Sequence, residues 1–300
     1  MADTSTKGSP ADDQNEPVTA PHKAATSSGL SYDEKRHVRE AAAPRAAVVY
    51  EIIRTKGDME LRRPISALWW SGVAAGISIG LSFLTEAAIA AHLPAGEASA
   101  LVAKLGYAVG FLVVILGHQQ LFTENVLTAV LPVISRRSFK WLKRMLRLWI
   151  LVLAANLVGC TIFALFLAKL PIVDASVAKA LGDIVKHLMA NTPYEMFVKG
   201  IGAGWMIAAL VWILSASEGS DFLIITLITY LIALFGLTHI VAGSAEAIYG
   251  VLTGLIDLEK AVYGFFLPTL SGNVVGGTVL FSVLSYAQVR EEIYLADHGN

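Results

Sequence analysis

Two histidines stand inside long apolar stretches of this sequence, where ionisable side chains are rare. Gly117-His118-Gln119-Gln120 interrupts the stretch 105–133, and Gly236-Leu237-Thr238-His239 interrupts the stretch 222–255. An ionisable group at such a place is costly unless it has a partner or a function. Because the reference pKa of histidine is about 6.5, His239 is expected to exchange a proton under physiological conditions. The alternative is a neutral, hydrogen-bonded histidine in a packed core.

Other polar residues near the interruptions are candidates for contact with a solute. Thr123 follows the first interruption, and its alternative role is to cap a helix. Glu124, next to it, is expected to accept capping hydrogen bonds or to tune selectivity. Lys199 would attract anions, unless it snorkels to the membrane surface. Glu86 and Glu195 lie near the ends of apolar stretches, so we expect water to solvate them.

Composition indicates that the elements carrying these residues cross a membrane. The chain has 300 residues, of which 55% are hydrophobic and only 16% charged. A helix needs about 20 apolar residues to cross a bilayer. Six stretches meet that length: 65–91, 105–133, 148–168, 194–216, 222–255 and 262–289. We therefore expect an all-α integral membrane protein of six transmembrane helices, with helices 2 and 5 broken.

The remaining segments have distinct compositions. Residues 1–31 are expected to be a disordered tail and residues 32–64 a cytoplasmic amphipathic helical segment. The transmembrane domain would occupy 65–289 and a cytoplasmic tail 290–300. Residues 135–147 contain six basic and no acidic side chains, which places this loop in the cytoplasm by the positive-inside rule. Both termini then lie in the cytoplasm.

An internal duplication is visible in the sequence. Asn156-Leu157-Val158-Gly159-Cys160 resembles Asn273-Val274-Val275-Gly276-Gly277, and Gly117 is matched with Gly236. Two units of three spans each have opposite orientations in a membrane. We therefore expect two inverted repeats, 65–168 and 194–289.

The interruptions also predict an electrostatic feature. Half-helices are expected to begin at about Phe122 and Ile240, with unpaired N–H groups directed toward the middle of the protein. The partial positive charge at such helix N-termini favours an anion. The two interruptions together indicate a pathway, because irregular backbone at membrane depth is tolerated only where protein or a water-filled cavity satisfies it.

Four motifs in this order resemble the formate/nitrite transporter family over about residues 65–286. They are Leu121-Phe122-Thr123, Val198-Lys199-Gly200-Ile201 with Trp205, Gly236-Leu237-Thr238-His239 and Gly272-Asn273-Val274-Val275-Gly276-Gly277. The resemblance implies an aquaporin-like fold and a homopentamer with one pore per subunit. It also implies that small monovalent anions or weak acids, such as formate or nitrite, pass through each pore. The expected location is the bacterial inner (plasma) membrane.

The resemblance further implies roles for particular residues. Leu121 and Phe122 would form an apolar constriction on the cytoplasmic side, and Thr123 and His239 a central polar pair. Lys199 and Asn273 would support His239. In the family, this histidine is thought to exchange a proton with the anion.

Several positions depart from the family pattern. Gln120 and Thr238 replace acidic residues, and Gly243-Ser244 replaces an Asn-Met or similar pair. His118, Gln119 and the run 123–128 resemble the less characterised YfdC-type branch of the family. These departures change the neighbours of the central histidine.

Three other functions are weighed against transport of an anion. A neutral small-solute channel of aquaporin-like architecture is the main alternative, although paired Asn-Pro-Ala caps are absent from the sequence. An enzyme or metal site would use His118, Glu124, His239 and Glu246, but these lack the spacing of metal ligands. A scaffold that binds a partner through the N-terminal region is the third. We expect no enzyme activity, cofactor, metal or nucleic-acid partner.

Overall fold

The computed structural model describes residues 30–34, 36, 44–217 and 219–298, without the side chains of residues 292–298. The chain divides into two units, Met1–Ala42 and Ala43–Asn300. In the first unit, residues 32–34 and 36 are helical. The tail expected at 1–31 lies almost entirely outside the described residues. All elements discussed below belong to the second unit.

The second unit consists of helices joined by short loops. Its first half contains α2 (Ala46–Glu60), α3 (Ile65–His92), α4 (Glu97–Ala103), the 3-10 turn η1 (Lys104–Gly106), α5 (Tyr107–Leu116), α6 (Phe122–Thr128), α7 (Val130–Arg136) and α8 (Phe139–Lys169). Its second half contains α9 (Ala175–Leu188), α10 (Pro193–Leu214), α11 (Asp221–Leu234), α12 (Ile240–Leu252), the π-helical η2 (Lys260–Phe266), α13 (Leu267–Val274), the π-helical η3 (Val275–Ser282) and α14 (Val283–His298).

The described residues contain no β-strand, and many of the helices are strongly apolar. Within the part of the chain that the structure describes, five helical stretches are long and apolar enough to cross a membrane: Ile65–His92, Glu97–Leu116, Phe139–Lys169, Pro193–Leu214 and Lys260–Glu291. α11 and α12 are apolar but shorter. The stretch before the first break is 20 residues long by itself.

The two predicted interruptions are breaks in the helices. α5 ends at Leu116 and α6 begins at Phe122, while α11 ends at Leu234 and α12 begins at Ile240. These two starting residues are the ones expected from the sequence. Both breaks begin with the same turn, in which one residue has positive φ. That residue is His118 at φ 50° in the first break and Gly236 at φ 60° in the second.

The match of Gly117 with Gly236 is wrong by one residue. The N–H of Gln119 bonds to the carbonyl of Val114, and the N–H of Leu237 bonds to that of Ile232 in the equivalent way. His118 therefore occupies the position of Gly236. Gly117 has an ordinary φ of −79°, so the sequence comparison paired two glycines that have different conformations.

Small residues bring the helices of each half into close contact. α3 packs mainly on α8, and α10 packs mainly on α13. A Cβ atom on Gly76 would lie 2.1 Å from the carbonyl oxygen of Asn156, and one on Gly204 would lie 2.3 Å from that of Asn273. Only glycine allows the two backbones to approach so closely.

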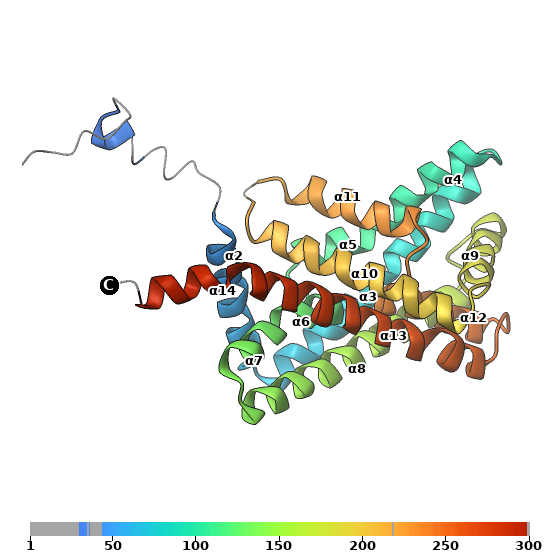
Figure 1. The fold of residues 1–300 in the computed structure, drawn as a ribbon. Helices are drawn as coiled ribbons and strands as arrows, with labels where there is room; N and C mark the ends of the chain where they lie inside the picture. Colours follow the sequence, from blue (N-terminus) through green and yellow to red (C-terminus); the bar gives the residue numbers. More distant parts are fainter. Residues whose placement is uncertain (1–29, 35, 37–43, 218, 299–300) are drawn as a thin grey trace, which may run out of the picture. The chain divides into compact units, whose positions relative to one another are not determined.

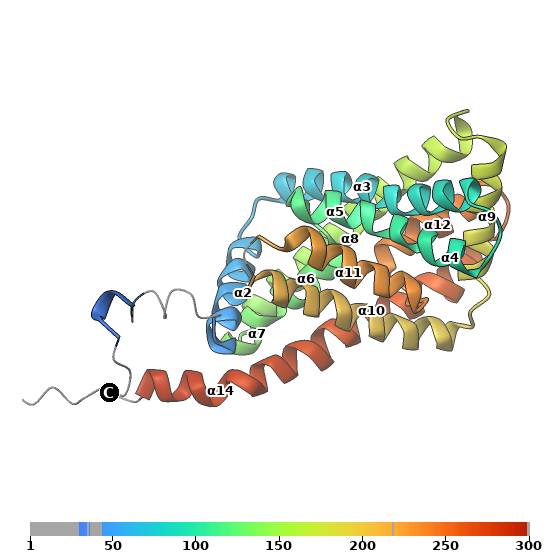
Figure 2. The same cartoon turned by 90° about the horizontal axis from the view of Figure 1, so that it is seen from above.

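The helices place different elements at the two ends of this unit. α2 and α7 lie at one end with the C-terminal part of α14, and α4 and α9 lie at the other (Figures 1 and 2). The breaks and the starts of α6 and α12 lie in the interior between these ends. A buried hydrophobic core surrounds them.

Candidate functional site

Thr123 and His239 meet at the centre of the molecule, although 116 residues separate them in the sequence. The hydroxyl oxygen of Thr123 lies 2.7 Å from Nε2 of His239. The two side chains are 3% and 2% exposed, respectively. Each belongs to the start of one half-helix, Thr123 to α6 and His239 to α12. The two helix starts therefore bring the predicted central polar pair together.

The hydrogen bonds of His239 determine which ring nitrogen carries the proton. The backbone N–H of Ala242 donates to Nδ1 at 3.1 Å, so Nδ1 must be an acceptor and His239 caps α12. Nε2 then carries the proton and donates it to the hydroxyl of Thr123. The ring is neutral in this arrangement, and both of its nitrogens are used.

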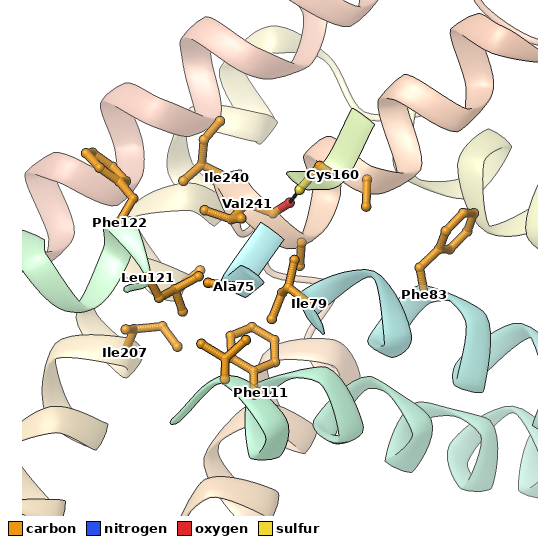
Figure 3. Packing of buried hydrophobic residues seen from close by; sticks show 14 of the residues in the cluster. Ala75, Ile79, Phe83, Phe111, Leu121, Phe122, Cys160, Ile207, Ile240 and Val241 are labelled. Atoms are coloured by element: carbon orange, nitrogen blue, oxygen red, sulfur yellow. Dashed lines mark hydrogen bonds between the residues drawn. The ribbon is translucent and has the colours of Figure 1, made fainter. Parts of the chain in front are cut away.

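Apolar side chains surround this pair. Leu121, Phe111 and Ile207 point toward one another below Ala75 and Val241 (Figure 3). The ring of Phe111 packs edge-on against that of His239, with 5.0 Å between centroids. Leu121 is 1% exposed and Phe122 is 2% exposed. Both predicted constriction residues are therefore buried, but only Leu121 packs with Phe111 of α5 and Ile207 of α10. The ring of Phe122 points away from this group (Figure 3) and packs edge-on against that of Trp149, with 6.0 Å between centroids.

A large cavity of about 1130 Å³ lies on the α2 side of the molecule, and we call it the α2 cavity. It is lined by α2, by the ends of α5 and α10, and by the first break. Three of the predicted site residues line it, His118, Gln120 and Glu124, together with Gln119 of the same break. Within the described residues, one carboxylate oxygen of Glu124 is buried without a hydrogen-bond partner. The structure thus separates Glu124 and His118 from the cavity that His239 lines.

A smaller cavity of about 70 Å³ lies on the opposite side, and we call it the α9 cavity. His239, Thr238 and Lys199 line it, together with Asn191 and Glu246. The ammonium group of Lys199 donates to the side-chain oxygen of Asn191 at 2.5 Å. Lys199 is therefore held in the wall of the cavity.

Asn273 is a neighbour of His239 but does not line either cavity. Its amide donates to the carbonyls of Gly200 and Thr238, and its oxygen accepts from the N–H of Ile240. It is fully buried. Asn273 therefore fixes the backbone on both sides of His239 rather than contacting a solute.

Asn156 makes the same three bonds in the first half of the chain. Its amide donates to the carbonyls of Gly72 and Gln120, and its oxygen accepts from the N–H of Phe122. The Asn repeat is visible in the sequence, but no role was predicted for Asn156. The repeat could have indicated this role, because two equivalent asparagines are expected to hydrogen-bond the free backbone groups at two equivalent breaks.

The helix N-termini are less free than expected. The first N–H of α6 and the first N–H of α12 already bond to Asn156 and Asn273, and His239 takes the N–H of Ala242. The expectation that unpaired N–H groups face the pathway is therefore wrong for these three groups. The partial positive charge of the helix ends remains near the Thr123–His239 pair.

Two acidic residues that were not predicted as site residues, Glu86 and Glu246, line the α9 cavity. Glu86 is 5% exposed and pairs with the ammonium group of Lys104 at 2.5 Å, so it is not a solvated boundary residue. Glu246 is 8% exposed and also lines the cavity. The spacing in the sequence could have indicated that Glu246 lies on the same side of the helix as His239. Residues seven apart on a helix share a face, and Glu246 follows His239 by seven.

Comparisons with known proteins agree with this arrangement. The sequence matches the family described as formate/nitrite transporter over residues 47–287. It is 41% identical over 249 residues to the inner membrane protein YfdC of Escherichia coli (strain K12), covering 83% of this chain and 80% of that protein. It is 27% identical over 254 residues to the formate channel FocA of Haemophilus influenzae, covering 74% of this chain and 86% of that protein.

Solved structures show the same fold. An FNT family ion channel superposes with a TM-score of 0.65 at 22% identity, covering 81% of this chain and 96% of its own. A pentameric formate channel with formate bound superposes with a TM-score of 0.63 at 19% identity, covering 77% of this chain and 98% of its own. The protein is thus an all-α membrane protein, and it belongs to the formate/nitrite transporter family as a member of the YfdC type.

Proposed function

We propose that the protein is a transmembrane channel or transporter for small monovalent weak-acid anions of the formate and nitrite kind. The observation that carries this proposal is the Thr123–His239 pair, buried between two cavities in a chain of this family. Relatives named as formate channels support it. An anion attracted by Lys199 would enter the α9 cavity and meet Nε2–H of His239.

The apolar side chains around the pair determine the form in which the solute crosses. An isolated charge is penalised far more in such surroundings than a neutral polar molecule. A weak-acid anion that takes up a proton avoids most of this penalty, whereas chloride has no such form at neutral pH. We therefore propose that the neutral acid crosses the cluster of Leu121, Phe111 and Ile207.

His239 was expected to supply that proton. In the observed arrangement its only ring proton is donated to Thr123, and losing it would leave an anionic ring among apolar side chains. We therefore propose that His239 and Thr123 bind and orient the solute through their polar hydrogens. The source of the proton is a separate question.

We further propose six membrane crossings, formed by α3, α4–α7, α8, α10, α11–α12 and η2–α14. The equivalent bonds of Asn156 and Asn273 support two inverted repeats, 65–168 and 194–289. The basic segment 135–147 supports a cytoplasmic position for the α2 end and both termini. The similarity to a pentameric formate channel supports a homopentamer, and the relationship to YfdC supports the bacterial inner (plasma) membrane.

The test is anion uptake into proteoliposomes that contain the purified protein. Formate, nitrite, acetate, lactate, hydrosulfide and chloride would each be offered over a range of external pH. Saturable uptake of at least one weak-acid anion is expected, with a fall of at least ten-fold in His239→Asn and in Thr123→Val. His92→Asn is the matched control, because His92 is exposed at the end of α3.

Two outcomes would contradict the proposal. Equal uptake by wild type and His239→Asn would remove the central pair from the pathway. Permeation of glycerol or ammonia without uptake of any anion would favour a neutral small-solute channel of the same architecture.

A further inference from the structure

The α9 cavity contains more acidic groups than an anion pathway needs. Glu246 lines it from α12, and Glu86 lines it from α3. An ionised carboxylate at this place repels an entering anion and lowers its local concentration. The two acids are therefore unfavourable for anion attraction, and they need another explanation.

Glu86 and Glu246 have different surroundings. Lys104 holds Glu86 in an ion pair, with 2.5 Å between the ammonium nitrogen and the carboxylate. Within the part of the chain that the structure describes, Glu246 has no hydrogen-bond or ion-pair partner. A buried carboxyl group without a partner is much less costly when it is protonated. Of the two ammonium groups at the cavity, Lys104 pairs with Glu86 and Lys199 donates to Asn191, so Glu246 is the carboxyl for which the protonated form is favoured.

The position of Glu246 connects the cavity with the central pair. α12 presents His239, Gly243 and Glu246 to the same cavity. Gly243 has no side chain, and the ring of Phe265 takes that space, with a ring carbon 2.6 Å from where a Cβ would lie. Glu246 and His239 nevertheless line the same cavity. At a share of about 30 Å³ per water, the cavity volume of about 70 Å³ has room for about two water molecules. Such waters would connect Glu246 with the outside solution.

Other charged or titratable groups face Glu246 across this cavity from every neighbouring element. They are Glu86 of α3, Lys104 of η1, Tyr107 of α5, His187 of α9, Lys199 of α10 and His239 of α12. Glu86 and Lys104 neutralise each other, and Lys199 is held by Asn191. His187 is exposed at the rim, and the proton of His239 is donated to Thr123. Glu246 alone among these groups combines burial with an unengaged carboxyl.

We propose that Glu246 is the proton donor that converts a weak-acid anion into its neutral acid within the α9 cavity. The O–H bond of the Glu246 carboxyl breaks and an O–H bond forms on the anion, so the negative charge moves from the anion to Glu246. The neutral acid crosses the apolar cluster, and Glu246 regains a proton from water on the α9 side. One proton thus accompanies each anion.

This inference rests on the proposed function, and its test separates the two. Proteoliposomes would carry a pH-sensitive dye inside, and formate would be added outside while internal acidification and electrical current are recorded together. Wild type is expected to acidify the interior as formate enters. Glu246→Gln keeps the shape of the side chain but cannot donate a proton. It is expected to lose at least ten-fold in formate-coupled acidification at neutral to alkaline pH, and any formate that still enters is expected to carry an electrical current.

Matched variants distinguish proton donation from a structural or purely electrostatic role. Glu246→Asp keeps a carboxyl group and is expected to restore acidification, whereas Glu259→Gln, at an exposed position, is expected to behave as wild type. A separate readout needs no transport: infrared difference spectra between high and low pH are expected to show a protonated carboxyl band that Glu246→Gln lacks. Melting in detergent verifies that each variant is folded.

Two results would overturn the assignment of Glu246 alone, and a third would overturn the proposed function as well. A wild-type ratio of protons to formate in Glu246→Gln would overturn the assignment of Glu246 while leaving formate transport in place. Absence of the carboxyl band would overturn it too. No flux of any anion in wild type would overturn the proposed function and this assignment with it.

Discussion

His118 occupies a backbone conformation that normally suits glycine. Its φ is 50°, and Gly236 has φ 60° at the equivalent position of the other half. A side chain in this left-handed region costs of order 1 kcal/mol. The side chain of His118 is exposed in the α2 cavity, so packing does not account for its presence.

Substitutions at these two positions are predicted to report backbone strain. Gly236→Ala should lower the free energy of unfolding by about 1 kcal/mol. No atom lies within 4 Å of the added Cβ, so the whole effect comes from the strain of an alanine backbone at positive φ. His118→Val should lower the free energy of unfolding by about 1–2 kcal/mol, because β-branched residues fit the left-handed backbone region poorly. His118→Gly should change stability by less than about 0.5 kcal/mol. Denaturation in detergent micelles measures all three.

The outcome that contradicts this argument is a loss in His118→Gly as large as that in His118→Val. The side chain of His118 would then matter rather than its backbone angle.

Asn156 and Asn273 are predicted to be the most sensitive polar residues of the fold. Each satisfies one backbone N–H and one carbonyl at a break, and it also donates to a carbonyl within a neighbouring helix, Gly72 of α3 or Gly200 of α10. Each unsatisfied buried group costs about 1–3 kcal/mol, so the two groups at each break predict that Asn156→Leu and Asn273→Leu each lower the free energy of unfolding by at least about 2 kcal/mol. Asn191→Leu, at a partly exposed site, should lose less than about 1 kcal/mol. Thermal melting of the three variants in one detergent compares them directly, and equal losses would refute the assignment.

At the scale of the elements, two glycine contacts bring the helices of each half together. Gly76 on α3 lies against the backbone of α8, and Gly204 on α10 lies against that of α13. These contacts position Asn156 and Asn273, which in turn hold the breaks. The placement of Thr123 and His239 therefore depends on close helix approach as well as on the breaks themselves.

Gly76→Ala and Gly204→Ala are predicted to separate these helix pairs. The added Cβ atoms would overlap with carbonyl oxygens at 2.1 and 2.3 Å, and overpacking of this kind costs about 1–3 kcal/mol. Gly182→Ala on α9 is the control, because its Cβ would meet one leucine methyl at 3.6 Å. This control should be neutral or more stable, since alanine favours a helix over glycine by up to about 1 kcal/mol. Melting temperatures in detergent measure the difference, and a tolerant Gly76→Ala would contradict the packing argument.

The sequence predicted these elements to different degrees. Hydropathy and polar interruptions located the apolar segments and the starts of α6 and α12, because both signals are local. The match of Gly117 with Gly236 failed because residue type does not reveal φ, and a histidine holds the left-handed position. The ion pair of Glu86 with Lys104 was missed because it joins α3 to η1 through the tertiary fold.

At the scale of the whole molecule, one chain provides every part of the proposed pathway. The α2 cavity, the Thr123–His239 pair and the α9 cavity are all formed by residues 44–298 of a single chain. A homopentamer would then contain five separate pathways. This arrangement differs from a channel along the symmetry axis, in which every subunit contributes to one pore.

Mixed assemblies are predicted to distinguish these two arrangements. Wild-type and His239→Asn chains with different tags would be co-expressed at several ratios, and native mass spectrometry would verify assembly and composition. With independent pathways, formate uptake should rise in direct proportion to the fraction of wild-type chains, because a neighbouring inactive chain removes only its own pathway. A shared axial pore would instead show a steep, power-law loss as inactive chains are added. Proportional uptake would thus place transport within each subunit, where the cavities and the central pair lie.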